Sequence, residues 1–227
     1  MGRKTFITGI VAILLVAAGA ARAETYSYTI QHPTFGDIGS YVDRIERTQE
    51  GMRIETTVHI AVRALGIVVH REDAQRSQEW HNGRLIRFEG VTTTNGNALA
   101  IHGEARGDHF VVDSPNGTAT APADVVLSDP WQATRSRMGG GSAVMLSTKT
   151  GKIETVHSSG GDAAMLSVHG VDVPARHYVY ATNKQQDVWL SERGIPLQFR
   201  TVENGTPIDF TLSRESLATL ALVSTPR

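Results

Sequence analysis

The strongest candidate for a functional site in this sequence is the group Glu79, His81 and Arg84. They flank Asn82-Gly83, a pair that suits the two positive-φ positions of a type I′ hairpin turn. With a two-residue loop, His81 faces Arg84 and Glu79 faces Ile86, so strand alternation places Glu79 and His81 on the face expected to be apolar. A carboxylate in such a place is costly unless it is paired.

Two interpretations of this grouping remain open. In the first, Arg84, Arg71 or Arg76 pairs with Glu79 in a functional site, because positions that break local rules are enriched in function. In the second, the carboxylate belongs to a rim ion pair near the end of the hairpin, where the sheet face is already wet and such pairs contribute little.

The strands around these residues recur later in the chain as a Trp–turn–strand–Asn-Gly–strand unit. Asn95 follows Trp80 by 15 positions (95 − 80), and Asn204 follows Trp189 by 15 (204 − 189). The same spacing indicates one supersecondary unit used twice, with both tryptophans pointing away from the main apolar face. They could form an aromatic platform for a ligand, or cover the second face of the sheet by packing.

The register of the two hairpins follows from their Asn-Gly loops. Alternation gives each hairpin one apolar face and one face with an opposed ion pair. In the second copy, Val188 and Leu190 occupy the positions that Glu79 and His81 hold in the first. The expected opposed pairs are Phe199–Phe210 and Phe88–Gly103 on the apolar face, and Arg200–Asp209 and Arg87–Glu104 on the other.

Short alternating runs rich in Val, Ile, Thr and Tyr, broken by Gly, Asn or Pro, continue through the chain. They predict an all-β fold of about fourteen strands: a single antiparallel, strongly curved sheet or incomplete barrel containing the two hairpin units. One domain is expected over residues 24–227. Residues 122–142 interrupt the rhythm and predict the crossover between halves, and residues 214–227 predict a tail that forms a helical turn or two or stays disordered.

The first 23 residues have the pattern of a signal peptide. Arg3-Lys4 is followed by an apolar run over 6–18, too short to span a bilayer, and by Ala21-Arg22-Ala23. Cleavage after Ala23 leaves 19 of the 22 basic side chains against 23 acidic ones. We expect a periplasmic or secreted protein whose mild negative charge disfavours nucleic acid and anionic lipid as main partners.

Several chemistries are excluded by the composition and motifs. The chain has no Cys, which excludes disulfides, zinc–thiolate sites and thiol catalysis. Its nine His residues show no metal-ligand spacing. Lys149-Thr150-Gly151 lacks the Ser-x-x-Lys that would accompany it in a penicillin-binding enzyme, and neither a Gly-x-Ser-x-Gly elbow nor a phosphate-binding loop occurs. No cofactor or metal is therefore expected.

The combined pattern resembles a domain-of-unknown-function family of exported bacterial β-proteins, a resemblance that implies neither an activity nor a ligand. At the level of fold it is also similar to periplasmic lipoprotein carriers, in which a curved half-barrel holds acyl chains. The residues that carry the family resemblance are Ile38-Gly39, Arg71, Glu79-Trp80, Gly83-Arg84-Leu85, Thr92–Gly96, Pro122, Trp131, Thr150-Gly151 and Trp189.

The leading hypothesis is a non-enzymatic binder that holds an apolar or amphipathic molecule, such as a lipid, in the concavity of the sheet. An envelope protein-interaction or structural module, acting through an edge strand or the tryptophan face, is the alternative. A hydrolase centred on Glu79, His81 and Arg84 is a weaker one. The candidate ligand-binding residues are Glu79, His81, Arg84, Arg71, Phe88, Trp80 and Trp189.

Overall fold

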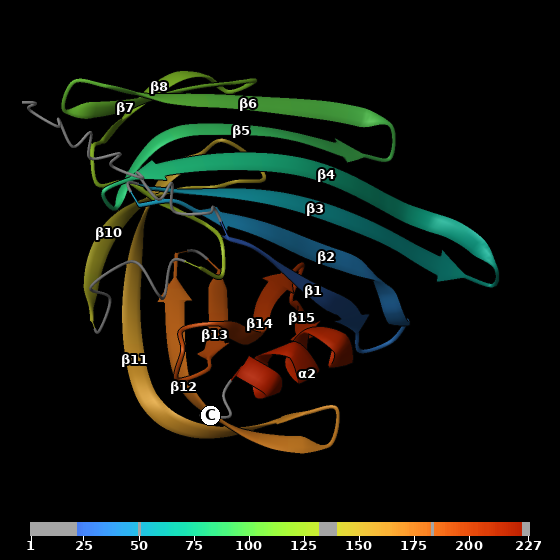
Figure 1. Ribbon diagram of the computed structural model, residues 1–227. Helices are drawn as coiled ribbons and strands as arrows, with labels where there is room; N and C mark the ends of the chain where they lie inside the picture. The colour runs from blue at the N-terminus through green and yellow to red at the C-terminus, as the bar shows by residue number, and fades with distance from the viewer. Residues whose placement is uncertain (1–21, 50, 132–139, 183, 224–227) are drawn as a thin grey trace, which may run out of the picture.

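The computed structural model describes residues 22–49, 51–131, 140–182 and 184–223 (Figure 1). The expected signal peptide lies outside the described residues except for its last two positions, which belong to the first strand. The first eight strands are β1 Arg22–His32, β2 Gly36–Arg47, β3 Gly51–Ala64, β4 Ile67–His81, β5 Arg84–Thr94, β6 Asn97–Arg106, β7 His109–Ser114 and β8 Gly117–Pro122.

A second series begins within the expected crossover, residues 122–142, and ends in a helix. Its elements are β9 Val126–Leu127, β10 Gly141–Leu146, β11 Ile153–Val168, β12 Val171–Ala181, β13 Gln185–Leu190, β14 Pro196–Glu203, β15 Thr206–Leu212 and α2 Arg214–Val223. Among the described residues, no helix has both the length and the hydropathy needed to cross a membrane.

All fifteen strands belong to one sheet in the order β8-β7-β6-β5-β4-β3-β2-β1-β15-β14-β13-β12-β11-β10-β9. After β8 the chain passes to the opposite end of the sheet, and the later strands return until β15 pairs with β1. Only β9 and β10 run parallel among the described pairs. The predicted all-β, curved antiparallel sheet is confirmed, with fifteen strands and without closure into a barrel.

The sheet curls so that its two series of strands face each other (Figure 1). Strands β1 to β8 form the upper layer, and β11 and β12 bend beneath it. The pairing of β11 with β12 shifts between Gly160 and Asp162, so a β-bulge adds to the bend. Gly160 has a φ of 110°, and a Cβ there would lie 2.4 Å from the carbonyl oxygen of His177. Glycine is required at this position because of both its backbone angle and the close approach of β12.

Helix α2 lies at the open side of the curl (Figure 1). Ser213 caps its N-terminus, since its hydroxyl accepts a hydrogen bond from the Ser216 amide at 3.2 Å. The Ser216 hydroxyl in turn accepts from the amide of Ser27 in β1 at 3.1 Å. Leu217 and Leu220 pack against the core, so the helix covers one margin of the concave face.

Side chains fill the concave side of the sheet. Around β1, β2, β14 and β15, Tyr28, Tyr41, Phe199 and Phe210 form an aromatic cluster with ring centroids 4.4–5.8 Å apart. A second cluster, between β4–β8 and the β9–β10 edge, contains Trp80, Leu85, Phe88, Phe110, Leu127 and Leu146. The interior between the described strands is therefore a packed core.

The predicted hairpin registers are confirmed at Asn95-Gly96 and Asn204-Gly205. Phe88 opposes Gly103 and Arg87 opposes Glu104 in the first, and Phe199 opposes Phe210 and Arg200 opposes Asp209 in the second. In the β7–β8 hairpin, Ser114 pairs with Gly117, so Pro115 and Asn116 form the loop.

Candidate functional site

A β-bulge at Ile86 in β5 overturns the expected orientation of the first repeated unit. The pairing of β4 with β5 shifts between Glu79 and Trp80, so that Glu79 opposes Arg87 and Trp80 opposes Leu85. The expected pairing of Glu79 with Ile86 is wrong, because Ile86 is the extra residue of the bulge in β5 and has no partner on β4. Strand β4 alternates regularly through this point, with Trp80 inward and Glu79 outward. Glu79 consequently lies on the outer face and Trp80 in the core.

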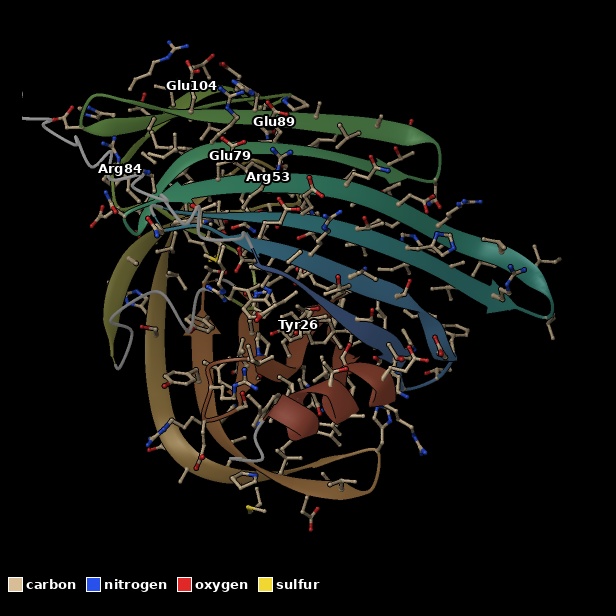
Figure 2. All side chains as sticks on the ribbon, in the orientation of Figure 1. Tyr26, Arg53, Glu79, Arg84, Glu89 and Glu104 are labelled. Carbon is tan, nitrogen blue, oxygen red and sulfur yellow. The ribbon has the colours of Figure 1, made fainter. Side chains whose placement is uncertain are left out.

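On the outer face, Glu79 is part of a solvated ladder of charges. Its side chain is 42% exposed, and its Oε1 lies 3.4 Å from Nη1 of Arg53 on β3. Arg53 also contacts Glu55 at 3.1 Å. Figure 2 shows Glu79, Arg53 and Glu89 on the outside of the curl, while Tyr26 lies within it. The observed partner of Glu79 is thus Arg53 on the adjacent strand, and exposed pairs of this kind contribute little to stability.

The other charged candidates are dispersed along the sheet. His81 is exposed at the end of the β4–β5 hairpin and opposes Arg84. The Arg84 guanidinium donates to the carbonyl oxygens of Gly107 and His109, which ties this hairpin to the β6–β7 turn. Arg71 stands near the opposite end of β4, where its Nε donates to Asp73 at 2.8 Å. These side chains therefore do not converge with Glu79 on one site.

The aromatic candidates also separate. Phe88 is fully buried and Trp80 is 7% exposed, so both are core residues, and the expectation that Trp80 points outward is wrong. Trp189 does lie on the outer side of β13, as expected. Its ring stacks on His177 with centroids 4.6 Å apart, and the Arg200 guanidinium lies 5.9 Å from its centroid.

A buried polar network that the sequence reasoning missed attaches the crossover to the concave face. Asp43 on β2 is fully buried; its Oδ1 accepts from the Thr56 hydroxyl at 2.6 Å and its Oδ2 from Nε1 of Trp131 at 2.7 Å. Alternation contains the signal, because Tyr41, Asp43 and Ile45 occupy successive inward positions of one strand. An acidic residue there needs buried donors, and Trp131, 88 residues away, supplies one.

The network continues from the crossover to β4. Oδ1 of Asp129 accepts from the Trp131 amide at 2.8 Å, and its Oδ2 accepts from the side-chain amide of Gln78 at 3.0 Å. Gln78 in turn accepts from Nε1 of Trp80 at 2.7 Å. The chain of hydrogen bonds therefore begins at Thr56 and Asp43, continues through Trp131, Asp129 and Gln78, and ends at the indole of Trp80. It fixes residues 129–131 against the sheet.

Burial dominates the electrostatics of this region. It raises the pKa of Asp43 to about 7, although the hydrogen bonds from Thr56 and Trp131 favour the carboxylate and oppose that rise. At the mouth of the curl, burial and then the hydrogen bond to Glu24 raise the pKa of Tyr26 to about 12. Arg193 and Arg47 act on Tyr26 in the opposite direction.

A recess of ≈ 410 Å³ opens next to Trp131 at this mouth. It is formed by the ends of β1, β2 and β3, the crossover and the β13–β14 loop. Its lining combines apolar side chains with two guanidinium groups and one carboxylate. The lining residues are Glu24, Arg47, Met52, Trp131, Arg193, Gly194 and Ile195.

The part of the chain that the structure describes contains no cluster of metal-ligating side chains. No group of three or more His, Asp or Glu side chains there is arranged to hold a metal ion. The recess offers two guanidinium groups, one carboxylate and apolar surface, which can bind and orient a small molecule.

Comparisons with known proteins give a family and a fold. The family model described as "Domain of unknown function (DUF6134)" matches residues 36–213. No curated protein has a matching sequence.

Two solved structures resemble the chain. The crystal structure of a β-barrel-like protein of domain of unknown function DUF1849 from Brucella abortus is 12% identical, with a TM-score of 0.62 over 83% of this chain and 94% of that one. A DUF1089 family protein from Pseudomonas aeruginosa is 11% identical, with a TM-score of 0.42 over 85% and 95% of the two chains. At 12% identity, the first similarity supports the barrel-like fold and carries no activity.

Proposed function

Because the chain belongs to the DUF6134 family, whose description names no activity, we propose a function from its geometry: non-enzymatic binding of a small amphipathic anion at the mouth of the curled sheet. The recess beside Trp131 carries this proposal. The proposed ligand is therefore smaller than an apolar molecule that would lie along the whole concavity, because side chains of the described strands fill the interior.

The size and apolar lining of the recess suit a small ligand. A volume of ≈ 410 Å³ falls within the range of about 300–1,000 Å³ typical of small-molecule sites. Met52, Trp131 and Ile195 line it from three separate segments, and the hydrogen bonds of Trp131 hold its indole in place. An apolar chain or ring of moderate size would therefore find a preformed surface, which lowers the entropic cost of binding.

The charge of the recess favours an anion. Arg47 and Arg193 line it together with Glu24, and Glu24 accepts a hydrogen bond from the Tyr26 hydroxyl at 2.9 Å. Both arginines stand close enough to Tyr26 to act on its pKa. Two guanidinium groups against one carboxylate leave a net positive site, and guanidinium groups bind carboxylate or phosphate through paired hydrogen bonds.

We place this binding function outside the cytoplasm, because the sequence begins with the charged, apolar and Ala-x-Ala segments of a secretory signal. A binder of amphipathic anions in the periplasm would meet free fatty acids and lipid fragments, which are ligands of this chemical class.

The test uses decanoate, followed by the fluorescence of the tryptophans and by calorimetry on the chain from Glu24 onward. Saturable binding of decanoate with weaker binding of decanol is expected. Arg47→Ala and Arg193→Ala should each weaken decanoate binding about tenfold, the loss of one charge-assisted contact. Arg106→Ala, an exposed arginine on β6, should bind as the parent does. Binding of decanol and decanoate with equal affinity, or no binding of either, would refute the proposal.

A second candidate function, a protein-interaction module, is favoured by the outermost strand β8. Among the described strands it pairs only with β7, and its residues 118–120 are exposed and uncharged. Such an edge can accept a strand from a partner. A photo-crosslinking residue at Ala119 should capture one defined envelope protein, while the same residue at Val91 should not. Monomer alone from both positions would remove this candidate.

A further inference from the structure

The β3–β4 hairpin extends beyond the strands on either side of it. Pairing of β2 with β3 ends at Ile60, and pairing of β5 with β4 begins at Glu72. Residues 61–71, here called the β3–β4 tip, pair only with each other among the described strands, from Ala61–Arg71 to Ala64–Ile67. Figure 1 shows this tip projecting past the neighbouring strands. At about 3.3 Å per residue it is about 13 Å long.

The tip is apolar at its apex and on both faces. Leu65 is 103% exposed, Ile67 69%, Val69 56% and Val68 43%. Ile67 opposes Ala64 and Val68 opposes Arg63, so these two consecutive side chains lie on opposite faces, and the register shift beside them leaves Val69 as a bulged residue. Four of the eight large exposed apolar side chains among the described residues thus cluster on one two-stranded projection. An apolar environment on every side of the projection would cover them.

The turn itself carries a residue that its backbone does not favour. Leu65 has a φ of 50°, and the residues at the corresponding position of three other hairpins are Asn82, Asn95 and Asn204, with φ of 49–50°. His169 has a φ of 52° in the β11–β12 turn. Asparagine and histidine adopt this conformation more readily than leucine does. The chain therefore accepts both backbone strain and a fully exposed leucine at one residue, a combination that points to a function for the side chain.

Basic side chains surround the base of the tip. Between Glu55 and Glu72 the sequence contains His59, Arg63, His70 and Arg71 and no carboxylate. The Arg71 amide donates to the Asn95 side chain at 2.9 Å, which anchors the base against the next hairpin. Asp73 pairs with both His59 and Arg71, and Glu72 pairs with Lys149, so the excess positive charge at the base rests on Arg63, although the whole chain has a formal charge of −1. Apolar residues at an apex with cations behind them match the order of acyl chains and phosphates in an anionic bilayer.

We propose that the β3–β4 tip inserts into the headgroup region of an anionic phospholipid bilayer and holds the protein at a membrane surface. A bilayer covers a projection from all sides, whereas a protein partner docked on one face would leave the other face exposed. The turn between β1 and β2 lies toward the same end of the sheet (Figure 1), and Phe35 in this turn, which is 43% exposed, offers a second apolar contact. Insertion by about 5–10 Å, typical of interfacial segments, needs no more than the length of the tip.

Co-sedimentation with phosphatidylcholine vesicles, with and without a quarter of phosphatidylglycerol, tests this proposal on the chain from Glu24 onward. The parent protein should bind the anionic vesicles more strongly than the neutral ones. Leu65→Asn should weaken binding about tenfold or more, as expected for a fully exposed leucine that becomes buried. Ile67→Thr should weaken it severalfold, and Val91→Thr, the matched change on β5, should alter it less than twofold.

The Leu65→Asn variant separates loss of binding from loss of fold. Since Asn suits the positive φ, its urea unfolding midpoint should equal or exceed that of the parent. Absence of parent binding to both vesicles, or equal binding by Leu65→Asn, Ile67→Thr and parent, would overturn the proposal. So would a lipid-independent dimer that Leu65→Asn abolishes, which would make a second copy the partner. Arg47→Ala should keep its vesicle binding, so failure of the decanoate site and failure of the tip are distinguishable.

Discussion

Substitution of Asp43 by Asn should remove a large pH dependence of stability. Asp43 is fully buried, and burial raises its pKa from the usual 3.8 of an aspartate to about 7. Because the folded-state pKa is the higher one, the folded protein binds more protons than the unfolded chain between about pH 4 and 7. The contribution of this group to stability is therefore greatest at low pH, falls as the pH rises through that window, and is constant above it.

The size of the effect follows from the shift. A difference of about 3 units at about 1.4 kcal/mol per unit gives about 4 kcal/mol between the two ends of the window. Since Asp43 has no exposed surface, solvent does not screen this cost. The Asn side chain can keep both contacts, with its oxygen toward Nε1 of Trp131 and its amide toward the Thr56 hydroxyl, which also accepts hydrogen bonds.

The measurement is urea unfolding of the parent and of Asp43→Asn at half-unit steps from pH 4 to 8.5. Other carboxyl groups titrate equally in both proteins, so the difference in unfolding free energy isolates Asp43. Relative to Asp43→Asn, the parent should lose about 4 kcal/mol as the pH rises to 7 and nothing further above it. A difference that stays constant across the range would refute the reasoning and would mean that the carboxylate is solvated in the folded state.

Three further results are expected. Glu79→Gln should change the unfolding free energy by less than about 0.5 kcal/mol, since it removes one exposed ion pair, and a loss of decanoate binding on this change would reopen a functional role for the residue. Gly103→Ala should lower the free energy of unfolding in urea by about 1–3 kcal/mol, because the added Cβ would lie 2.5 Å from the buried ring of Phe110. Gly90→Ala, whose added Cβ has its nearest contact at 3.2 Å, should lower it by less. A larger loss for Gly90→Ala than for Gly103→Ala would contradict the packing. Mass spectrometry of the protein recovered from the periplasm should find Glu24 at its N-terminus, and retention of residues 1–23 would contradict the proposed cleavage.

Local sequence rules were sufficient for the class of fold and for two hairpins. Alternation of polar and apolar residues requires a sheet with one buried face, and the Asn-Gly loops at 95–96 and 204–205 set the register of the strands they join. Both are short-range effects, because turn geometry and side-chain alternation act between residues that are neighbours in the chain or across one loop.

The candidate site depended on contacts that no local rule contains. The bulged residue Ile86 in β5 places Glu79 on the outer face and Trp80 on the inner face, and the turn residues of the sequence give no sign of this insertion. The pairing of β1 with β15, and the bond from Trp131 to Asp43, join segments far apart in the sequence.

By itself, the sequence determined an all-β chain with paired hairpins, because its periodicity and turn residues act locally. Only the tertiary structure decided which side chains fill the concavity, where a recess remains at its mouth, and which hairpin projects beyond its neighbours. The physical reason is that curvature, bulges and strand lengths decide which distant residues meet, and each depends on the packing of the whole sheet.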